Sequence, residues 1–563
     1  MQGKALSSGI GIGTALVYTE PTIAYSKITN ADPAAEMARF DQAVVAFVSA
    51  AESKMQGVSE EQAAVLDAHN TFAQDPEIRS GVEGTLEAKH CNSEEAIEIV
   101  FNRSIEMFEA FEDEMWRERA RDLKDIRDAL LRRLLGIETP DLSGIPTGTV
   151  LIAHELTPSV TAGLDASRVA AFVIEVGGVT SHTAILARSL EIPAVAHESA
   201  LESINDGDPL IVDGNTGLIT VHPDAAALES AQKSQQQARE KAALLRELVG
   251  KTSQTADGKI LDVFCNIGQP ADCERALEND AEGIGLFRTE FLYMEHDSLP
   301  SEDMQFDAYK QVVTAFAGKT VIFRTMDVGG DKDIPYLNLA KEENPFLGFR
   351  AIRHSLVYQD VFLTQLRALL RASAFGDAWI MLPMISSIHE LRDAKALVEK
   401  AKESLRNENV AFNENIRVGI MIETPAAALT ADSLAKEADF FSVGTNDLTQ
   451  YTTAVDRGNE RVAALYSPYH PAVLRLIQMA ARAANEANIP MGMCGEAAAE
   501  EALIPVWIGL GLNELSVSAP RVLATRARIL SIDSARAKAI ADKALALPSA
   551  VDVCEYLQSE MNS

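Results

Sequence analysis

Residues 177–188, GGVTSHTAILAR, place one histidine at the predicted start of a helix. A helix N-terminus presents unpaired N–H groups and partial positive charge, which together bind an anion such as phosphate. The same field disfavours imidazolium, so we expect His182 to stay neutral with a ring nitrogen free to attack. A site that accepts phosphate is one interpretation. An exposed histidine on an ordinary capped helix is an alternative that these residues alone support almost equally.

A second group of reactive side chains follows the predicted strands of the C-terminal half. Arginines predominate, and clustered guanidinium groups suit the oxygens of phosphates and carboxylates. Their mutual repulsion would make little sense without an anion among them. Taken singly, each arginine could equally belong to a surface ion pair. The candidates are Arg288, Arg324 and Arg457, with Arg350 as a weaker one.

Acidic, amide and thiol side chains occur at the same strand ends. Glu423 and Asp447 supply hard oxygen ligands, too few for a closed calcium site but typical of Mg2+ that substrate and water largely hold. Asn446 can form a hydrogen bond with a phosphate or enol oxygen. Cys494 has no metal-binding neighbour, so proton transfer and nucleophilic attack are both open to it. The alternative for Cys494 is a buried core thiol.

These residues require a fold that brings several strand ends together. From about residue 260 onward, eight short apolar strands alternate with helical stretches. Eight βα repeats over about 280 residues match a (β/α)8 barrel, in which the chemistry lies at the C-terminal ends of the strands. The interval between the third and fourth strands, which includes NPFLGFRAIR, is long enough to contain another strand.

His182 precedes this region and belongs to a different pattern. Residues 1–20 predict a glycine-punctuated β segment, and residues 33–136 predict helices with apolar residues three and four apart. Short strands then return, so we expect an α/β unit with the helical block inserted after its first strand. Residues 224–249 are polar and lack Gly and Pro, which indicates either a long exposed connecting helix or an ordinary surface helix.

The predicted fold class is therefore an α/β multidomain protein. It combines an α/β domain that carries the histidine, an inserted all-helical subdomain, a long linker helix and a C-terminal (β/α)8 TIM barrel. The predicted boundaries are 1–20 with 141–222 for the α/β domain, 21–140 for the helical subdomain, 223–252 for the linker helix and 253–563 for the barrel.

Composition limits the possible partners and the compartment. The 563 residues include 50 Lys and Arg against 82 Asp and Glu, and the formal charge of −32 repels nucleic-acid phosphates and anionic lipid. The five cysteines form no CxxC pair, which fits a reducing compartment. No apolar run approaches the ~20 residues that span a bilayer. We expect a cytoplasmic protein that binds no nucleic acid and inserts into no membrane.

Taken together, the motifs resemble one family, Enzyme I of the bacterial phosphoenolpyruvate:sugar phosphotransferase system. GGVTSHTAILARSLEIPAV is similar to its phosphohistidine signature. Its phosphoenolpyruvate-barrel motifs are similar to GLFRTEFL, FRTMDVGGDK, GIMIETPAA, SVGTNDLTQYTTAVDRGN and MGMCGE. The resemblance covers essentially the whole chain in order. One departure is Val179, where many relatives carry a basic residue, and this change could alter the stability of a phosphohistidine.

The resemblance implies phosphoryl transfer from phosphoenolpyruvate to Nε2 of His182 and then to the phosphocarrier protein HPr, with release of pyruvate. Cys494 would protonate the enolate carbon, and Glu423 with Asp447 would hold Mg2+. The helical subdomain, in particular RDLKDIRDALLRRLLG, would dock HPr, and the barrel would form a homodimer. The residues implied to bind phosphoenolpyruvate are Arg288, Arg324, Asn446, Asp447 and Arg457, to which Arg350 is added as the weaker candidate.

Since the histidine and the barrel residues belong to different domains, the α/β domain would have to swivel about linkers near 140–150 and 222–250. Pyruvate phosphate dikinase and phosphoenolpyruvate synthase are alternatives, but they need a large ATP-binding domain where this sequence has the helical block. The nitrogen-regulatory paralogue of Enzyme I typically carries an N-terminal sensory domain, which we do not find here. A non-catalytic phospho-binding regulator would need an incomplete set of metal and arginine residues, and this set looks complete.

Overall fold

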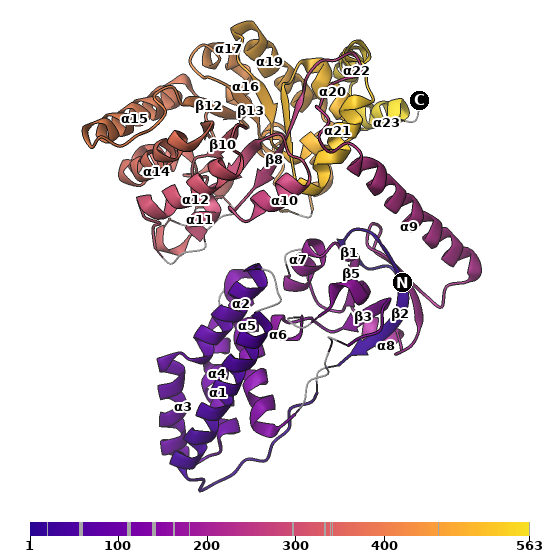
Figure 1. Cartoon of the computed structure of the whole chain (residues 1–563), viewed down its shortest axis with the longest axis vertical. Coiled ribbons are helices and arrows are strands. Elements are labelled where there is room, and N and C mark those ends of the chain that lie inside the picture. Colours follow the sequence, from indigo (N-terminus) through magenta and orange to yellow (C-terminus); the bar gives the residue numbers. More distant parts are fainter. Residues whose placement is uncertain are drawn as a thin grey trace. The chain divides into compact units, whose positions relative to one another are not determined.

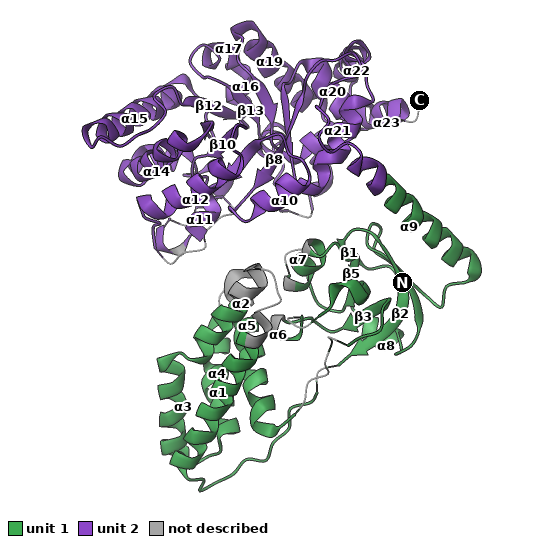
Figure 2. Ribbon diagram, in the orientation of Figure 1, with its two compact units in different colours: residues 1–241 green, residues 242–563 purple. Residues whose placement is uncertain are grey.

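The computed structural model describes residues 1–561 except for residues 20, 56–59, 110–113, 138–141, 143, 162–163, 179–180, 295–297, 331–333, 338, 341 and 460. The chain forms two compact units, residues 1–241 and 242–563 (Figure 2). Figure 1 gives the labels of the elements. Among the described residues, no helix is both long and apolar enough to cross a membrane.

The first unit contains a seven-stranded mixed sheet in the order β1-β5-β4-β3-β2-β6-β7. The central strands β2, β3, β4 and β5 run parallel, and the pairs β1–β5, β2–β6 and β6–β7 are antiparallel. Alternate residues of the central strands point to opposite faces, so each face has its own buried cluster. The strands are β1 (Lys4–Ser7), β2 (Ile10–Tyr18), β3 (Thr149–Ala153), β4 (Val169–Ile174), β5 (Ala194–Ala196), β6 (Pro209–Asp213) and β7 (Leu218–Val221).

Short helices cover the two faces of this sheet. Helix α7 (His182–Ser189) packs on one face through Ala184 and Ala187, and α8 (Ala200–Ser203) packs on the other through Ala200. Helix α6 (Pro158–Thr161) follows β3. The sheet therefore carries the start of α7, the predicted site of phosphate acceptance, at the loop that follows β4.

The helical block lies between β2 and β3, which are hydrogen-bonded neighbours. Its apolar faces enclose a core that includes Phe40, Phe101 and Leu130. The block follows the second strand rather than the first, because Gly9, with a φ of 118°, ends β1 before β2 begins. Its helices are α1 (Pro33–Met55), α2 (Glu60–Ala73), α3 (Pro76–Lys89), α4 (Ser93–Glu109) and α5 (Glu114–Leu135).

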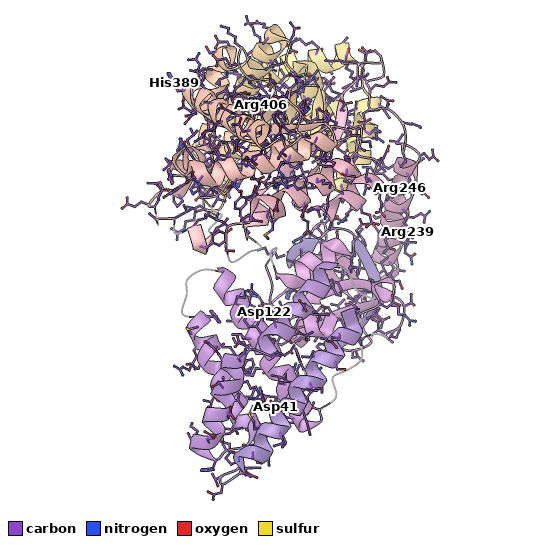
Figure 3. The ribbon with its side chains drawn as sticks, turned by 60° about the vertical axis from the view of Figure 1, so that its left-hand side comes forward. Asp41, Asp122, Arg239, Arg246, His389 and Arg406 are labelled. Carbon is purple, nitrogen blue, oxygen red and sulfur yellow. The ribbon has the colours of Figure 1, made fainter. Side chains whose placement is uncertain are left out.

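Helix α9 (Ala225–Arg246) connects the two units, and the division between them falls within it. Arg239 and Arg246 lie along this helix (Figure 3). Within α9 only Ala231 is buried. Gln235 Nε2 donates to Ile10 O at 2.6 Å in the first unit, and Arg246 Nη1 donates to Glu278 O at 2.8 Å in the second. Of the two interpretations of this segment, the connecting helix is therefore correct.

The second unit is a closed barrel of eight parallel strands, as predicted. Inward-facing side chains form one buried cluster inside the barrel, and outward-facing side chains form a larger cluster against the helices. The strands are β8 (Asp262–Ile267), β9 (Ile284–Arg288), β10 (Val321–Arg324), β11 (Ala378–Leu382), β12 (Arg417–Ile422), β13 (Phe441–Val443), β14 (Met491–Met493) and β15 (Glu514–Val517).

The helices of this unit surround the barrel in Figure 1. Between β10 and β11 the described residues form helices and loops but no strand, so the possible extra strand is absent there. The helices are α10 (Asp272–Glu278), α11 (Glu290–Met294), α12 (Glu302–Ala315), α13 (Ile352–Val357), α14 (Gln359–Ala372), α15 (Ile388–Asn407), α16 (Pro425–Leu429), α17 (Ala431–Leu434), α18 (Thr445–Thr453), α19 (Pro471–Ala487), α20 (Ile504–Leu510), α21 (Val522–Leu530), α22 (Ser534–Ala546) and α23 (Ala550–Met561).

Candidate active site

The predicted barrel residues lie at the C-terminal ends of the strands. Arg288 and Arg324 are the last residues of β9 and β10, and their Cα atoms are partners in the sheet register. Glu423 follows β12, Asp447 lies in the first turn of α18 directly after β13, and Cys494 follows β14. The barrel therefore gathers at one end residues that are as far as 206 positions apart in sequence (288 to 494).

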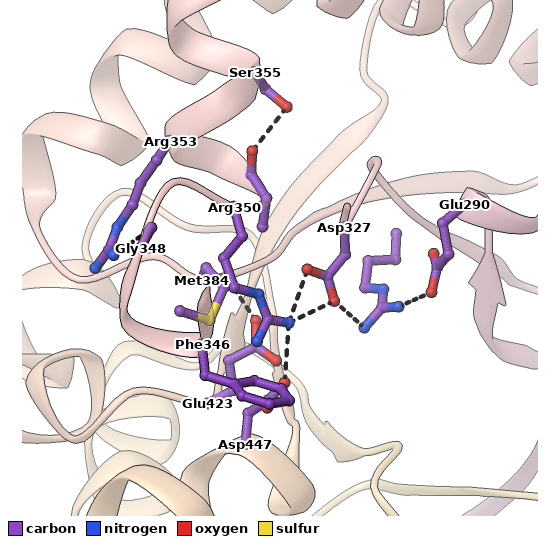
Figure 4. A network of polar contacts seen from close by, with 12 residues as sticks. Glu290, Asp327, Phe346, Gly348, Arg350, Arg353, Ser355, Met384, Glu423 and Asp447 are labelled. Atoms are coloured by element: carbon purple, nitrogen blue, oxygen red, sulfur yellow. Dashed lines mark hydrogen bonds and ion pairs between the residues drawn. The ribbon is translucent and has the colours of Figure 1, made fainter. Parts of the chain in front are cut away.

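A buried network of alternating charges joins two of the predicted arginines (Figure 4). Arg350 Nη2 donates to both carboxylate oxygens of Asp327, at 2.9 and 3.1 Å. Arg324 Nη1 lies 3.1 Å from Asp327 Oδ2, and its other terminal nitrogen donates to Glu290. Arg350 also reaches Asp447 Oδ2 at 3.4 Å. Asp327 therefore separates two guanidinium groups that would otherwise repel each other.

The carboxylates of the network keep both guanidinium groups charged. Burial alone would lower the pKa of Arg324, but the charges of Glu290 and Asp327 outweigh it and raise that pKa above its usual range. Asp327 and Asp447 raise the pKa of Arg350 in the same way against its burial. The repulsion between these two arginines therefore does not require a bound anion, because the chain supplies the anions itself.

Two donors of the network nevertheless remain available. The Nε–H groups of Arg324 and Arg350 are buried, and neither has a hydrogen-bond partner in the described part of the chain. A buried donor without an acceptor costs about 1–3 kcal/mol. An oxygen-rich anion at these strand ends could satisfy both.

The candidate metal ligands lie at the ends of adjacent strands. Glu423 Oε1 accepts the backbone N–H of Met384 at 2.5 Å, and Asp447 Oδ1 is buried without a hydrogen-bond partner among the described residues. A Cβ on Gly444 would lie 2.9 Å from Glu423 Oε2, so the glycine leaves room at that oxygen. Burial, then the charges of Asp447 and Asp327, raise the pKa of Glu423 to about 8. A cation beside these oxygens would relieve that repulsion.

The donor set suits Mg2+, which prefers oxygen ligands and keeps several water or substrate ligands. No group of three or more His, Cys, Asp or Glu side chains in the described ranges is arranged to hold a metal by itself. Any cation here would therefore take its remaining ligands from substrate and water.

The loop DVGG has glycines where Arg350 approaches it. Gly329 has a φ of 101°, and a Cβ there would lie 2.7 Å from Arg350 Cβ. Gly330, with a φ of 76°, also adopts a backbone conformation that favours glycine. Ala351 has a φ of 53° without being glycine, which places local strain directly after Arg350. The tight loop positions Arg350 against Asp327.

Cys494 lies in the interior of the barrel next to this network. Its thiol donates to Val443 O at 3.7 Å and packs with Leu286, Ile322 and Met421. Burial raises the pKa of the thiol to about 12, so the group is protonated near pH 7. A protonated thiol gives up a proton more readily than it attacks an electrophile, since the thiolate is the nucleophile. Of the two chemical roles considered for Cys494, the structure favours proton transfer.

The other predicted ligands lie outside the ion-pair network. Asn446 Nδ2 donates to Glu496 Oε1 at 3.3 Å, and the N–H of Glu496 donates to Asn446 Oδ1 at 3.2 Å. The hydroxyl group of Tyr466 donates to Asn446 O. Burial raises the pKa of Tyr466, and the positive charge of Arg457 opposes that rise, so Arg457 lies near this tyrosine. Arg288 is half-buried at the end of β9, and no ion pair involves it within the described residues. These side chains remain candidates for contact with a ligand.

His182 begins α7, as predicted. Ser181 caps the helix, since its Oγ accepts the N–H of Ala184 at 3.3 Å. The side chain of His182 and the whole of Val179 lie outside the described residues. His182 belongs to the first unit and the charged network to the second.

Comparisons with known proteins identify the family. Three family descriptions match: "PEP-utilising enzyme, N-terminal" at residues 2–119, "PEP-utilising enzyme, mobile domain" at 145–217 and "PEP-utilising enzyme, PEP-binding domain" at 242–534. The phosphoenolpyruvate-protein phosphotransferase of Bacillus sp. (strain S) is 45% identical over 565 residues, which cover 99% of this chain and 97% of the relative. This chain belongs to the phosphoenolpyruvate-protein phosphotransferase family. The family that the motifs resemble is confirmed, and so is the enzyme class that this resemblance implies.

Other family members match over the same length. The phosphoenolpyruvate-protein phosphotransferase of Streptococcus equinus is 44% identical over 571 residues, with 100% of this chain and 98% of the relative covered. That of Bacillus subtilis (strain 168) is 41% identical over 563 residues, with 99% of each chain covered. The match of the PEP-binding domain contains every residue of the barrel network described above.

Two residues of the network were missed by sequence reasoning, Asp327 and Glu290. Both lie in motifs that were singled out, FRTMDVGGDK and GLFRTEFL, at positions three and two residues after an arginine, respectively. A carboxylate that close to an arginine at a strand end is the signal that could have identified them. Their roles depend on packing: Asp327 lies between Arg324 and Arg350, and Glu290 binds the far side of Arg324.

Proposed function

We propose that this chain transfers a phosphoryl group from phosphoenolpyruvate to Nε2 of His182 and then to HPr, with release of pyruvate, as the first step of the sugar phosphotransferase system. The observation that carries the proposal is the buried charged network at the barrel's strand ends, with a protonated Cys494 in the layer next to it. Phosphoryl transfer depends mainly on positioning and on compensation of charge. The network supplies fixed groups of both signs for this purpose.

Phosphoenolpyruvate carries a carboxylate and a phosphate, and guanidinium groups bind both. The buried Nε–H groups of Arg324 and Arg350 have room for acceptors, which supports a role in substrate binding. Arg288 and Arg457 are half-buried and would complete the set of cations, while Asn446 would donate to a substrate oxygen. The network would hold the substrate with its phosphoryl group exposed to an incoming nucleophile.

Glu423 and Asp447 would hold Mg2+ beside the substrate, and they are the two carboxylates that fit it best. When bound, the ion supplies positive charge for the transferring phosphoryl group and the enolate oxygen that leaves it. Asp447 also binds Arg350, so the same carboxylate would link the ion's position to that of a substrate-binding arginine.

Departure of the phosphoryl group leaves the enolate of pyruvate, whose methylene carbon needs a proton. Cys494 belongs to the predicted set, is buried, and carries a thiol that is protonated near pH 7 and can donate that proton. Its thiol would protonate that carbon and become a thiolate. The apolar residues around it exclude water from the enolate.

His182 would receive the phosphoryl group as a neutral imidazole at the start of α7. Because it belongs to the α/β domain, residues 1–20 and 141–222, this domain would have to swivel between the barrel and the helical subdomain, residues 21–140, where HPr would dock. Residues 253–563 would also form the homodimer interface. We place the protein in the cytoplasm. The linkers near 140–150 and 222–250 would be the hinges of this movement.

Labelled phosphoenolpyruvate provides the test. With Mg2+ and HPr, the label should pass to HPr, and the His182→Ala variant should transfer none, because the nucleophile is gone. The matched control is His154→Ala, an exposed histidine of the same unit that contacts Glu175, which should transfer normally. Unchanged labelling of HPr by the His182→Ala variant would contradict the proposal. Labelling from ATP instead of phosphoenolpyruvate would favour a dikinase-like enzyme.

A further inference from the structure

A buried carboxyl group lies inside the barrel in the layer below Cys494. Glu514 is the first residue of β15, and its neighbours Leu515 and Val517 belong to the outer cluster, so Glu514 and Ser516 face inward. A Cβ on Gly492 would lie 1.7 Å from Glu514 Oε2, and one on Gly285 would lie 2.5 Å from Oε1. The carboxyl group therefore fills space that two inward-facing glycines leave empty.

This carboxyl group has no cation beside it. Among the described residues, Glu514 forms no ion pair, and its Oε1 is buried without a hydrogen-bond partner. Burial, and then the charge of Asp262, raise its pKa well above the usual range. Burial without a neighbouring cation therefore favours the neutral carboxylic acid, which has a proton to give.

Packing alone does not explain an acid at this position. Burying a polar group without a compensating hydrogen bond is unfavourable relative to leaving it in water. An apolar side chain of similar size would fill the same space without that cost. A buried polar group that lacks partners in a folded protein calls for a functional explanation.

A hydroxyl group on the neighbouring strand faces the same interior as this acid and the thiol. Gly492 lies in β14 and Cys494 directly follows that strand, two residues or about 6.6 Å further along the chain. A carboxyl group beside Gly492 is therefore too far from the thiol for a direct hydrogen bond. Ser442 of β13 is the register partner of Gly492, so it lies at the level of the Glu514 carboxyl group. Its Oγ is buried without a hydrogen-bond partner among the described residues. The Cys494 thiol contacts the carbonyl of Val443, the next residue of the same strand.

We propose that Glu514 returns a proton to Cys494 after each turnover, through the hydroxyl group of Ser442. The inference rests on the proposed function, in which the S–H bond of Cys494 breaks as the C–H bond of pyruvate forms. The Ser442 O–H proton then passes to the thiolate, and the Glu514 O–H proton passes to the Ser442 oxygen. The thiol and the hydroxyl are restored, and Glu514 is left as a carboxylate.

The carboxylate of Glu514 is reprotonated from the opposite end of the barrel. Asp262, the first residue of β8, is its register partner and faces the same interior, since Leu261 and Val263 belong to the outer cluster. Asp262 is half-buried, so it contacts both solvent and the interior. Acidic and hydroxyl groups thus extend from the solvent at the N-terminal ends of the strands to the thiol at the C-terminal ends.

Groups other than Glu514 hold the backbone around Cys494. A structural role of Glu514 can therefore be distinguished from a role in proton transfer. Asn266 Nδ2 donates to Cys494 O at 3.0 Å, and Ser516 Oγ donates to Asn266 Oδ1 at 2.6 Å. Neither hydrogen bond involves Glu514. A change of Glu514 to glutamine should therefore leave the position of Cys494 unchanged while removing the acid.

The experiment is a rapid-quench measurement of pyruvate with excess phosphoenolpyruvate, Mg2+ and HPr. Glu514→Gln should form the first pyruvate per active site at the wild-type rate, because Cys494 starts with its proton. Later turnovers should slow by about a hundredfold, the lower end of what a positioned acid contributes. The expected trace is a burst of one pyruvate per site followed by a slow phase. Ser442→Ala, which removes a hydroxyl group that has no hydrogen-bond partner among the described residues, should give the same trace.

The matched control is Glu282→Gln, a carboxylate of the same barrel end that accepts the N–H groups of Val263 and Ser253. It should show no burst. The inference would be overturned if the later turnovers of both Glu514→Gln and Ser442→Ala ran at the wild-type rate. It would also be overturned if the first and the later turnovers of the two variants slowed equally. A failure of the proposed function has a different signature, since the wild-type chain itself would then form no pyruvate.

Discussion

Asp327 provides the sharpest test of how the charged network is held together. Its carboxylate lies between the guanidinium groups of Arg324 and Arg350, and the side chains of all three are at most 8% exposed. Asp327→Asn keeps the shape of the side chain and one acceptor oxygen but removes the charge. Two buried cations would then face each other with less compensation, so we expect the second unit to lose stability.

The expected loss can be estimated from the burial of the network. Removing one partner of a buried ion pair costs about 3–5 kcal/mol. Because Asp327→Asn keeps one amide oxygen as an acceptor, we expect a loss at the lower end, about 3 kcal/mol of the free energy of unfolding. A unit of about 320 residues unfolds with an entropy near 0.7 kcal/mol/K, so that loss lowers its midpoint by about 4 °C. Differential scanning calorimetry of the full chain measures this shift in the transition of the second unit.

The barrel surface offers a matched control of the same composition. Glu302 lies between Arg367 at 2.6 Å and Arg371 at 2.7 Å, but these three side chains are 19–24% exposed. Because exposed ion pairs contribute about 0–1 kcal/mol, Glu302→Gln should lower the midpoint by no more than about 1 °C. If Asp327→Asn costs no more than Glu302→Gln, the argument from burial is wrong.

A double substitution separates charge from packing. Adding Arg350→Met to Asp327→Asn removes one of the two uncompensated cations, so part of the lost stability should return. If the two substitutions instead lower the midpoint additively, repulsion between the guanidinium groups is not the cause of the loss.

Three further predictions concern pH, the linker and the metal site. Burial raises the pKa of Cys265, Cys273 and Cys494 from about 9 to about 12, so the stability that these neutral thiols contribute below pH 9 should be lost between pH 9 and 12, by up to about 1.4 kcal/mol per pH unit for each. Urea unfolding from pH 8 to 11 measures this slope, and a flat profile would refute it. Arg526→Met removes a buried side chain that donates to Leu248 O at 3.1 Å, Ser253 Oγ at 2.9 Å and Asp280 O at 2.7 Å, so limited proteolysis near residue 248 should speed up more than cleavage far from these contacts. Glu423→Gln should raise the Mg2+ concentration for half-maximal activity about tenfold or more, and an unchanged Mg2+ dependence would exclude this carboxylate as a ligand.

Much of the fold could be predicted because its signals are local. The alternation of short apolar strands with helical stretches predicted eight strands, and all eight pair in a closed barrel. The helical spacing of residues 33–136 and the start of α7 at His182 depend on contacts within a few residues of one another. The two strands of the N-terminal segment were merged in the prediction, because one glycine with a positive φ separates them.

The candidate site was predicted only in part. The positions of Arg324, Glu423 and Cys494 after predicted strands were enough to place them at one end of a barrel. The pairing of Arg324 with Asp327 and Glu290 was not predicted, and the anions beside this arginine are carboxylates of the chain itself. Which carboxylate meets which guanidinium depends on loop conformations such as that of Gly329.

The sequence by itself determined the residue types, the order of the elements and the ends of strands at which chemistry could occur, because these follow from local spacing and from a regular barrel. Only the tertiary structure decided the charge state and reach of each group. Burial keeps Cys494 protonated, and closure of the barrel raises the pKa of Glu514 because it removes the carboxyl group from water. Desolvation and pairing depend on contacts between distant segments, and no local pattern encodes them.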